Sequence, residues 1–425
     1  MKALNYGLIA LLFMTPLLFG TVEAWSLALM EIICFFLSAF YLLRKIKTEK
    51  SKITIVKPPL LIPALALLGI ALFQVIPLPP SILKIISPNT YDIYKNALLF
   101  GDPLPWLTLS LYPYATVMEI LRFTAYISVY FLTFQLLRDR ASIMRLTTAI
   151  MITGAVIALI GIFQAIFYNG KLLWFRGFQA GTPFGPYVNR NHFAGLMEMV
   201  IPVCISMLIL FLPKTRAGYS LRALVSDIFG QKRTNSFILS FTTVIVMITA
   251  LFLSLSRGGI IGLSVSMLLF GILLLIRNST RKNGVMILVI FVIVLFTVGW
   301  FGWKPIIDKF EKMKGSDASS EYRLNNWKDS ANMIMDFPVL GTGFGTYEYI
   351  YPKYKTIPVQ QKWEHAHNDY IEGAAEFGIP GLLIAVFFIA SFYKQMLTKI
   401  KQRRSLHPRL LWIGALTGIT AMLIH

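Results

Sequence analysis

The chain has 425 residues, of which 56% are hydrophobic and only 14% are charged. A soluble domain carries about 25% charged residues, so this composition excludes an ordinary soluble globular protein. Several apolar runs approach or exceed the roughly 20 residues that a helix needs to cross a bilayer, and they are too long for the strands of a membrane barrel. We therefore predict an all-α polytopic membrane protein.

The net charge of +20 is of a size that also occurs in nucleic-acid-binding proteins. Here, however, Lys and Arg concentrate in short connections between the apolar runs, which is the distribution that sets membrane orientation. We therefore expect no nucleic-acid partner. The two cysteines, Cys34 and Cys204, fall inside apolar runs, so we expect neither a disulfide nor a metal site from them.

Eleven apolar runs are predicted to be transmembrane helices. They lie near residues 6–22, 25–43, 59–79, 116–137, 145–168, 191–213, 236–255, 258–276, 285–302, 372–393 and 409–425. The first run, between Lys2 and Ala24, also has features of a signal peptide, and we favour a transmembrane helix. The last run ends at His425 without a basic anchor, so we expect the chain to be truncated before a twelfth helix.

The distribution of basic residues predicts the orientation of these helices. The connections that hold 22 of the 40 Lys and Arg residues are 44–57, 138–145, 214–233, 277–282 and 394–408. They alternate with the other connections along the chain, so the amino terminus is expected in the cytoplasm and the long connection 303–371 outside. This gives three predicted parts: helices within 1–302, an outward-facing folded loop domain at 303–371, and two last helices within 372–425.

Two of the chain's five histidines, His365 and His367, lie at the end of this long loop. Histidine has the side-chain pKa nearest neutrality, so it is the natural group to take a proton from an alcohol. The pair also suggests a zinc site, but no third ligand stands at a suitable spacing, and we expect no metal.

Arg257 interrupts the apolar stretch 236–276, in the sequence Ser256-Arg257-Gly258-Gly259. The charge pattern places this interruption at the outer surface. Arg257 is either a turn residue that reaches the interface or a phosphate ligand, because a guanidinium group binds phosphate oxygens bidentately and stays charged. Gly258 would let a phosphate approach the backbone amides at the start of the next helix.

Four other residues are candidates for the same outward-facing site. Arg323, in the long loop, is a second phosphate ligand or a partner in a surface salt bridge. Arg122 stands three residues after a glutamate, and a structural ion pair is favoured there. Arg190 and Asn191 either cap the helix that follows them or contribute to the outer cavity, and the sequence favours neither.

Two other features argue against alternative functions. The glycine-rich stretch 341–345 has no strand–helix unit around it, so we expect no nucleotide site and no cofactor. The acids Glu31, Glu119 and Glu198 fall in the outer third of their predicted spans, whereas a proton-coupled pump places ionisable groups near the membrane midplane.

These motifs together resemble the O-antigen ligase and O-antigen polymerase superfamily of bacterial envelope glycosyltransferases. The signature is His367-Asn368, nine residues, Gly378, two residues and Gly381. The Ser256-Arg257-Gly258 turn, the pair Arg323 and Trp327, and the stretches 189–194 and 338–345 also agree with the family pattern. The resemblance covers about residues 180–385.

The resemblance implies a multi-pass protein of the bacterial inner membrane, with about twelve spans and a periplasmic active site. It would transfer a glycan from undecaprenyl pyrophosphate to an acceptor hydroxyl, with no metal or cofactor. His367 would be the general base, and Arg257 and Arg323 would bind the pyrophosphate. Residues expected in supporting roles are Asn368, Gly258, Asn191, Arg190 and Arg122. His365 does not match the signature, so we expect it to be an ordinary loop residue.

The expected partners are membrane lipid, the lipid-linked donor and an acceptor. The identity of the acceptor distinguishes a ligase from a polymerase. A ligase joins the glycan to lipid A-core, or to a protein in some relatives, whereas a polymerase extends another lipid-linked glycan. We favour a ligase because the His367-Asn368 signature and the Arg257 turn are both clear. A flippase or exporter of lipid-linked oligosaccharides is the alternative from another class, and the sparsely charged inner halves of the spans argue against it.

Overall fold

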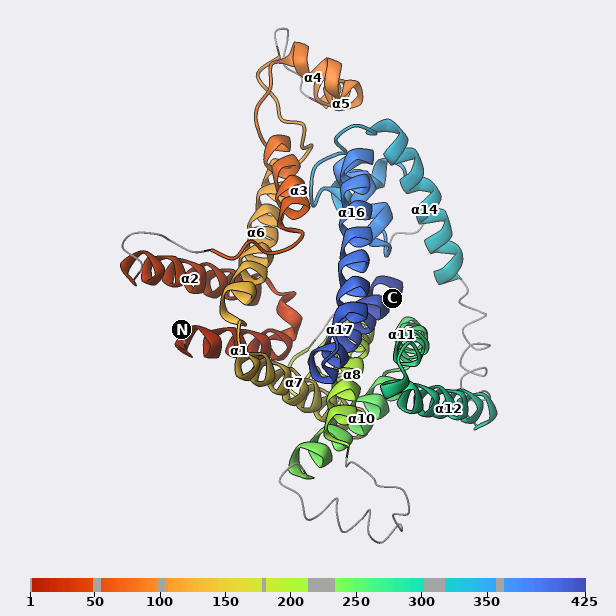
Figure 1. The fold of residues 1–425 in the computed structure, drawn as a ribbon. Coiled ribbons are helices and arrows are strands. Elements are labelled where there is room, and N and C mark those ends of the chain that lie inside the picture. Colours follow the sequence, from red (N-terminus) through yellow and green to blue (C-terminus); the bar gives the residue numbers. More distant parts are fainter. Residues whose placement is uncertain are drawn as a thin grey trace, which may run out of the picture. The chain divides into compact units, whose positions relative to one another are not determined.

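The computed structural model describes residues 2–48, 55–97, 104–177, 181–212, 234–301, 318–356 and 363–425 (Figure 1). The side chains of residues 234, 293–301 and 318–322 lie outside this description. Within the described ranges the regular elements are helices, together with four isolated β-bridges. The predicted all-α class is therefore confirmed for these parts of the chain.

A helix lies at each of the eleven predicted spans, and further helices lie in the segments between them. In chain order they are α1 (Lys2–Leu17), η1 (Phe19–Thr21), α2 (Ala24–Thr48), α3 (Leu61–Gln74), α4 (Pro80–Ile86), α5 (Pro88–Ala97), α6 (Pro113–Leu136), α7 (Arg140–Ile166), α8 (Arg190–Phe211), α10 (Thr234–Ser254), α11 (Arg257–Leu275), α12 (Asn278–Phe301), α14 (Ala318–Asp336), α15 (Tyr347–Ile350), η3 (Tyr351–Lys353), α16 (Asp369–Gln402) and α17 (Leu406–Ile424).

Eight of the described helices are long and apolar enough to cross a membrane, which makes the chain a multi-pass membrane protein. These are α2, α6, α7, α8, α10, α11, α16 and α17. Two more apolar helices, α1 and α3, have only 16 and 14 residues. For the second half of α12, residues 293–301, the structure describes the backbone only. A total of eleven spans, or twelve with a further helix, therefore remains a prediction.

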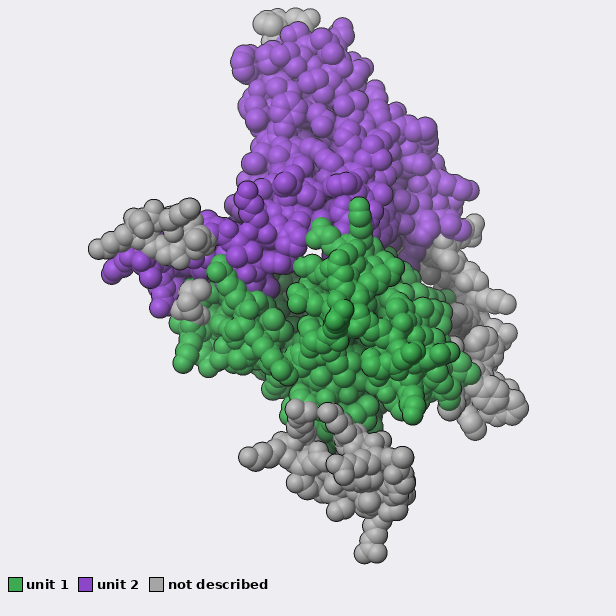
Figure 2. Space-filling model, viewed as in Figure 1, with its two compact units in different colours: residues 1–33, 136–302, 393–425 green, residues 34–135, 303–392 purple. Residues whose placement is uncertain are grey.

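The chain forms two compact units, and each is assembled from segments far apart in the sequence (Figure 2). Unit 1 comprises residues 1–33, 136–302 and 393–425, and unit 2 comprises residues 34–135 and 303–392. Helices α2 and α16 run from one unit into the other. The predicted division of the chain at residues 302 and 371 remains a prediction.

Helix α8 lies in the core of unit 1, where it packs against α7, α10, α11 and α17. Small residues allow the backbones to approach closely, as is common between membrane helices. A Cβ atom on Gly418 of α17 would overlap the backbone carbonyl of Met199 on α8. The Ser206 hydroxyl also donates a hydrogen bond across this contact to the Leu410 carbonyl, at 2.8 Å.

The core of unit 2 joins α14 and α16 to the segment between them. Gln74, the last residue of α3, is fully buried, and its side chain connects this core to α3 by hydrogen bonds. Its amide nitrogen donates to the carbonyls of Leu340 (2.6 Å) and Glu376 (2.7 Å). Its amide oxygen accepts the Phe344 N–H at 3.0 Å. A polar residue inside an apolar run is thus used to satisfy the backbone of an irregular loop.

The glycine-rich stretch 341–345 is that irregular loop, and its glycines are required by its conformation. Gly341 and Gly343 have φ values of +67° and +114°, a region that residues with a Cβ atom rarely adopt. A Cβ atom on Gly341 would also overlap the backbone of Glu376 on α16. Close packing against α16 therefore explains why glycine occupies this position.

Candidate active site

The backbone just before His367 is fixed on both sides by side chains of two different helices. Ala366 is fully buried, and its carbonyl accepts a hydrogen bond from the indole N–H of Trp327 on α14 at 3.0 Å. Its own N–H donates to a carboxylate oxygen of Glu372 on α16 at 2.8 Å. Both peptide groups that flank Ala366 are therefore held, and they fix where the chain enters His367.

His367 itself has a strained backbone and an exposed side chain. Its φ of +53° lies in the left-handed region, where residues with a Cβ atom are uncommon and the strain is of order 1–3 kcal/mol. The imidazole lies edge-on to the Trp363 ring, with 5.6 Å between the ring centroids. Such strain persists only where the surroundings impose it, and it is concentrated at functional sites. The geometry thus supports a functional role for His367.

Asn368 fixes the chain on the other side of His367. Its side-chain oxygen accepts hydrogen bonds from the N–H groups of Tyr370 (3.1 Å) and Ile371 (3.2 Å), in the first turn of α16. Asparagine is among the residues most favoured in this capping role. This cap anchors the chain directly after His367, and a supporting role of Asn368 in the reaction stays a prediction.

His365 lies in the loop before α16, as expected, and its ring is paired with Glu372 on that helix. Its Nδ1 lies 2.8 Å from the second carboxylate oxygen of Glu372. This hydrogen bond raises the pKa of His365 to about 9. Glu372 thus holds two consecutive residues of the turn. Sequence reasoning missed Glu372, although an acid in the first turn of the helix after the histidine pair was a usable signal.

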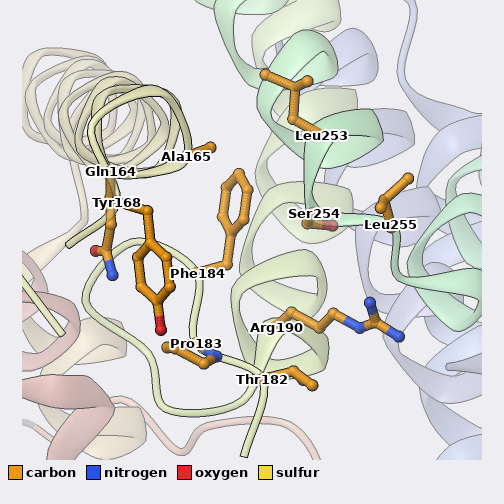
Figure 3. Close-up of a pocket in the computed structure, with 10 residues that line it drawn as sticks. All are labelled: Gln164, Ala165, Tyr168, Thr182, Pro183, Phe184, Arg190, Leu253, Ser254 and Leu255. Atoms are coloured by element: carbon orange, nitrogen blue, oxygen red, sulfur yellow. The ribbon is translucent and has the colours of Figure 1, made fainter. Parts of the chain in front are cut away.

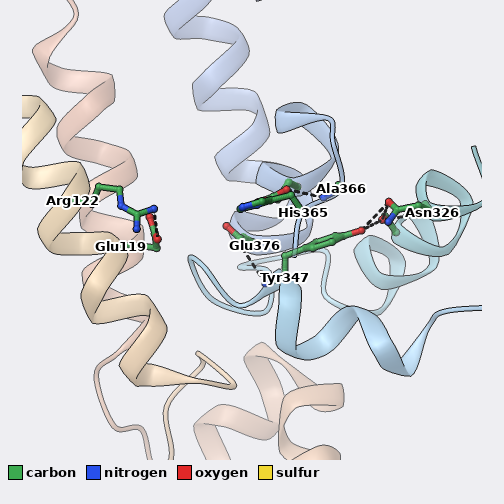
Figure 4. Close-up of polar contacts among 9 residues, drawn as sticks. Glu119, Arg122, Asn326, Tyr347, His365, Ala366 and Glu376 are labelled. Carbon is green, nitrogen blue, oxygen red and sulfur yellow. Dashed lines mark hydrogen bonds and ion pairs between the residues drawn. The ribbon is translucent and has the colours of Figure 1, made fainter. Parts of the chain in front are cut away.

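A buried polar network connects α16 to α14 behind this turn (Figure 4). The carboxylate of Glu376, one turn after Glu372, accepts the Tyr347 N–H at 3.0 Å. The Tyr347 hydroxyl lies 2.9 Å from the amide oxygen of Asn326 on α14. The network keeps α14 in place, so it also stabilises the hydrogen bond from Trp327 to Ala366.

Arg323 lies on the same helix as Trp327, one turn earlier, and its side chain is exposed. Residues four positions apart lie on the same helical face, so Arg323 lies on the face of α14 that holds the His367 turn. Arg122, on α6, forms the predicted ion pair with Glu119 at 2.7 Å (Figure 4). Because Glu119 also packs against Gly345, this pair supports the glycine-rich loop.

The remaining candidate residues meet in unit 1, at the starts of α8 and α11. Asn189 caps α8 by accepting the Asn191 N–H at 2.9 Å. The side-chain oxygen of Asn191 accepts a hydrogen bond from the Ser256 hydroxyl at 2.8 Å. The first residues of the two helices, Arg190 and Arg257, are close enough to repel each other electrostatically. The stretch 189–194 therefore caps a helix and also joins the Arg257 turn.

The two glycines after Arg257 allow α11 to pack closely on its neighbours. A Cβ atom on Gly259 would lie 2.5 Å from the Cβ of Ala194 on α8. One on Gly258 would lie 3.0 Å from the His425 ring. Helix packing is thus sufficient to explain both glycines, and the expected approach of a phosphate to the backbone at Gly258 remains a prediction.

An open pocket of about 280 Å³ lies beside Arg190 in unit 1 (Figure 3). It is lined by the C-terminal end of α7, Tyr168 just beyond that helix, residues 182–184, Arg190 and residues 253–255. The sequence left open whether residues 189–194 cap a helix or contribute to an outer cavity, and of this stretch Arg190 lines the pocket. The residues of its α7 wall were not anticipated.

The candidate site residues divide between the two units. Unit 1 holds Arg190, Asn191, Arg257 and Gly258, and unit 2 holds Arg122, Arg323, His367 and Asn368. Within unit 1 a hydrogen bond joins Asn191 to the Arg257 turn, and within unit 2 Trp327 joins α14, which carries Arg323, to the turn before His367, whereas Arg122 pairs with Glu119 on α6. Their action on a common substrate remains a prediction.

Residues 242–386 match a protein-family model described as O-antigen ligase. The matched stretch runs from α10 into α16, and it contains Arg257, Arg323 and His367. No curated protein matches the chain.

Proposed function

We propose that this member of the O-antigen ligase superfamily, whose family domain spans residues 242–386, transfers a glycan from undecaprenyl pyrophosphate to an acceptor hydroxyl. The acceptor is lipid A-core or a similar molecule, so the activity is that of a ligase. The donor's lipid lies in the same membrane as the helices. The observation that carries this proposal is the fixed, strained position of the exposed His367 within the family domain.

In the proposed reaction His367 acts as the general base. It takes the proton from the acceptor hydroxyl, whose oxygen attacks the anomeric carbon of the donor sugar from the face opposite the pyrophosphate. The bond between that carbon and the pyrophosphate oxygen breaks, and the electron pair leaves with the pyrophosphate. The anomeric configuration is inverted. General base catalysis of this kind contributes about 10²–10⁴-fold to the rate.

Arg257 and Arg323 bind the pyrophosphate and stabilise the charge that develops as it leaves. The hydrogen bond between Ser256 and Asn191 supports this assignment, because it joins the starts of α8 and α11, where Arg190 and Arg257 stand, and guanidinium groups at adjacent helix starts suit a multiply charged pyrophosphate. Pyrophosphate is already a good leaving group, so the proposed reaction uses neither a metal nor a cofactor. Positioning of the two substrates supplies a further part of the rate.

The alternation of basic and non-basic connections supports the proposed location. In the proposed orientation the basic connections are cytoplasmic and the loop domain 303–371 lies in the periplasm, with the chain in the bacterial inner membrane. His367 and Arg257 then lie on the periplasmic side, where a lipid-linked glycan meets its acceptor.

Product analysis with purified protein tests this proposal. The protein is incubated with an undecaprenyl-pyrophosphate-linked glycan and lipid A-core, and the products are separated by size. A single glycan added to the core is the result expected of a ligase. A ladder of lengthening glycans on the lipid carrier would instead identify a polymerase. Movement of the donor across a vesicle membrane without any transfer would identify a flippase and overturn the proposal.

A further inference from the structure

Gln164, near the C-terminal end of α7, lines the pocket beside Arg190, and no described residue hydrogen-bonds to its amide group. The side chain is only 2% exposed. Both its amide nitrogen and its amide oxygen are buried without a hydrogen-bond partner among the described residues. Buried amides in native proteins are nearly always hydrogen-bonded, and an unpaired one lowers stability. An unpaired donor and acceptor in a pocket wall therefore indicate a ligand that supplies the missing partners.

The other walls of the pocket combine aromatic and hydroxyl groups. Tyr168, two residues beyond the end of α7, is 49% exposed, and Phe184 forms a buried part of the wall. Thr182 contributes a hydroxyl near Arg190 (Figure 3). An acyl chain would leave the Gln164 amide unpaired. A sugar ring offers hydroxyl groups that both donate to and accept from an amide, and its C–H faces pack on aromatic rings.

The size and position of the pocket restrict which sugar it can hold. Its volume of about 280 Å³ is near the lower end of the range for small-molecule sites, roughly 300–1,000 Å³, so it suits a single sugar rather than an oligosaccharide. Arg190 is part of its wall and lies within electrostatic reach of Arg257. The pocket therefore lies beside Arg190 and within electrostatic reach of Arg257, one of the two arginines proposed to bind the pyrophosphate.

We infer that this pocket binds the sugar attached directly to the donor's pyrophosphate, and that the Gln164 amide hydrogen-bonds to a hydroxyl or acetamido group of that sugar. The inference rests on the proposed function, since it takes the donor to be a pyrophosphate-linked glycan. Gln164 then determines which first sugar is accepted, whereas the arginines recognise the pyrophosphate that all such donors share.

The variant Gln164→Met tests this inference, because methionine has a similar length but no hydrogen-bonding amide. Binding is measured for three probes: undecaprenyl pyrophosphate without sugar, and two donors whose first sugar differs in an acetamido group in place of a hydroxyl. We expect the wild-type protein to prefer one of the two donors. In Gln164→Met the affinity for the preferred donor should fall about fivefold to tenfold, as for the loss of a hydrogen bond, while affinity for the sugar-free probe stays unchanged.

Two controls distinguish a binding role from a structural one. Phe163→Leu changes an exposed neighbour of Gln164 on α7, and it should leave the binding of all three probes unchanged. The melting temperature of Gln164→Met should equal or exceed that of the wild-type protein, because the substitution removes two unpaired buried polar atoms. A lower melting temperature with unchanged donor preference would assign Gln164 a structural role and overturn the inference.

The binding measurement separates failure of this inference from failure of the proposed function. If the wild-type protein transfers glycan but Gln164→Met binds both donors and the sugar-free probe as before, only the pocket assignment is wrong. Equal weakening of all three probes would assign the pocket to the lipid or the pyrophosphate, which also overturns it. If no transfer occurs but Gln164→Met selectively loses the sugar-bearing donor, the pocket assignment stands and the proposed reaction is wrong.

Discussion

Glu372 holds the turn before His367, and its replacement by alanine tests whether that turn positions the base. The substitution removes both carboxylate oxygens. The N–H of Ala366 loses its acceptor at 2.8 Å, and the His365 ring loses its partner at the same distance. The hydrogen bond from Trp327 to the Ala366 carbonyl remains. The turn is then held from one side only.

The size of the effect follows from the burial of the two partners. Ala366 is fully buried, so loss of a charged acceptor for its N–H costs roughly 1.5–3 kcal/mol. The His365 side chain is 67% exposed, so solvent screening limits its pair with Glu372 to at most about 1 kcal/mol. The sum is comparable to the strain of about 1–3 kcal/mol stored at His367. We therefore expect the left-handed turn to relax and the imidazole to move.

A displacement of about 1 Å at a reacting group lowers the rate by about 10²-fold, and this is the loss in kcat that we predict for Glu372→Ala. Initial rates of transfer are measured with purified protein, donor and lipid A-core. The matched control is Glu364→Ala, which removes an exposed carboxylate from the same loop and should change the rate by less than about twofold.

The conservative variant Glu372→Gln distinguishes positioning from folding. Its amide oxygen can still accept the Ala366 N–H, so we expect it to recover about tenfold of the lost rate. A rate for Glu372→Ala equal to that of the wild-type protein would refute the positioning argument. So would a Glu372→Gln variant that melts like the wild-type protein yet transfers no faster than the alanine variant.

Three other outcomes follow from single contacts. Glu372 raises the pKa of His365 from about 6.5 to about 9, so their contact stabilises the turn fully below about pH 6.5 and is lost as the pH rises through 9. The transfer rate, measured from about pH 6 to 10, should therefore fall over that window. The variant His365→Gln should abolish this fall. Gly259→Val should lower the melting temperature in detergent, because overpacking against Ala194 costs about 1–3 kcal/mol. An unchanged melting temperature would contradict the close packing of α11 on α8. Arg257→Lys keeps the charge but not the bidentate geometry, so the donor KM should rise about tenfold, and an unchanged KM would contradict a role for Arg257 in pyrophosphate binding.

The parts of the molecule that depend on local sequence were predictable. Each of the eleven apolar runs coincides with a helix, because the length and hydropathy of a run are properties of that run alone. The Asn368 cap and the Arg122–Glu119 ion pair can also be predicted from the sequence, since each joins residues only a few positions apart. The signature singles out His367, and its role as the base stays a prediction.

The contacts that give these residues their environment were not predictable, because they join distant segments. Nothing near Gln74 in the sequence shows that it satisfies the backbone of residues 340–344. Likewise, nothing near Gln164 indicates a pocket wall. The sequence left two roles open for Asn191, a helix cap or part of the outer cavity. Its hydrogen bond to Ser256, 65 positions away, shows that it also joins the Arg257 turn.

The most direct test of the central claim is the rate of glycan transfer by His367→Gln. Glutamine keeps a hydrogen-bonding side chain of similar reach but has no group that takes a proton near neutral pH. Transfer should fall by about 10²–10⁴-fold, the usual contribution of a general base, while donor binding and the melting temperature stay at their wild-type values. A folded His367→Gln variant that binds the donor and transfers glycan at the wild-type rate would contradict the assignment of His367 as the base.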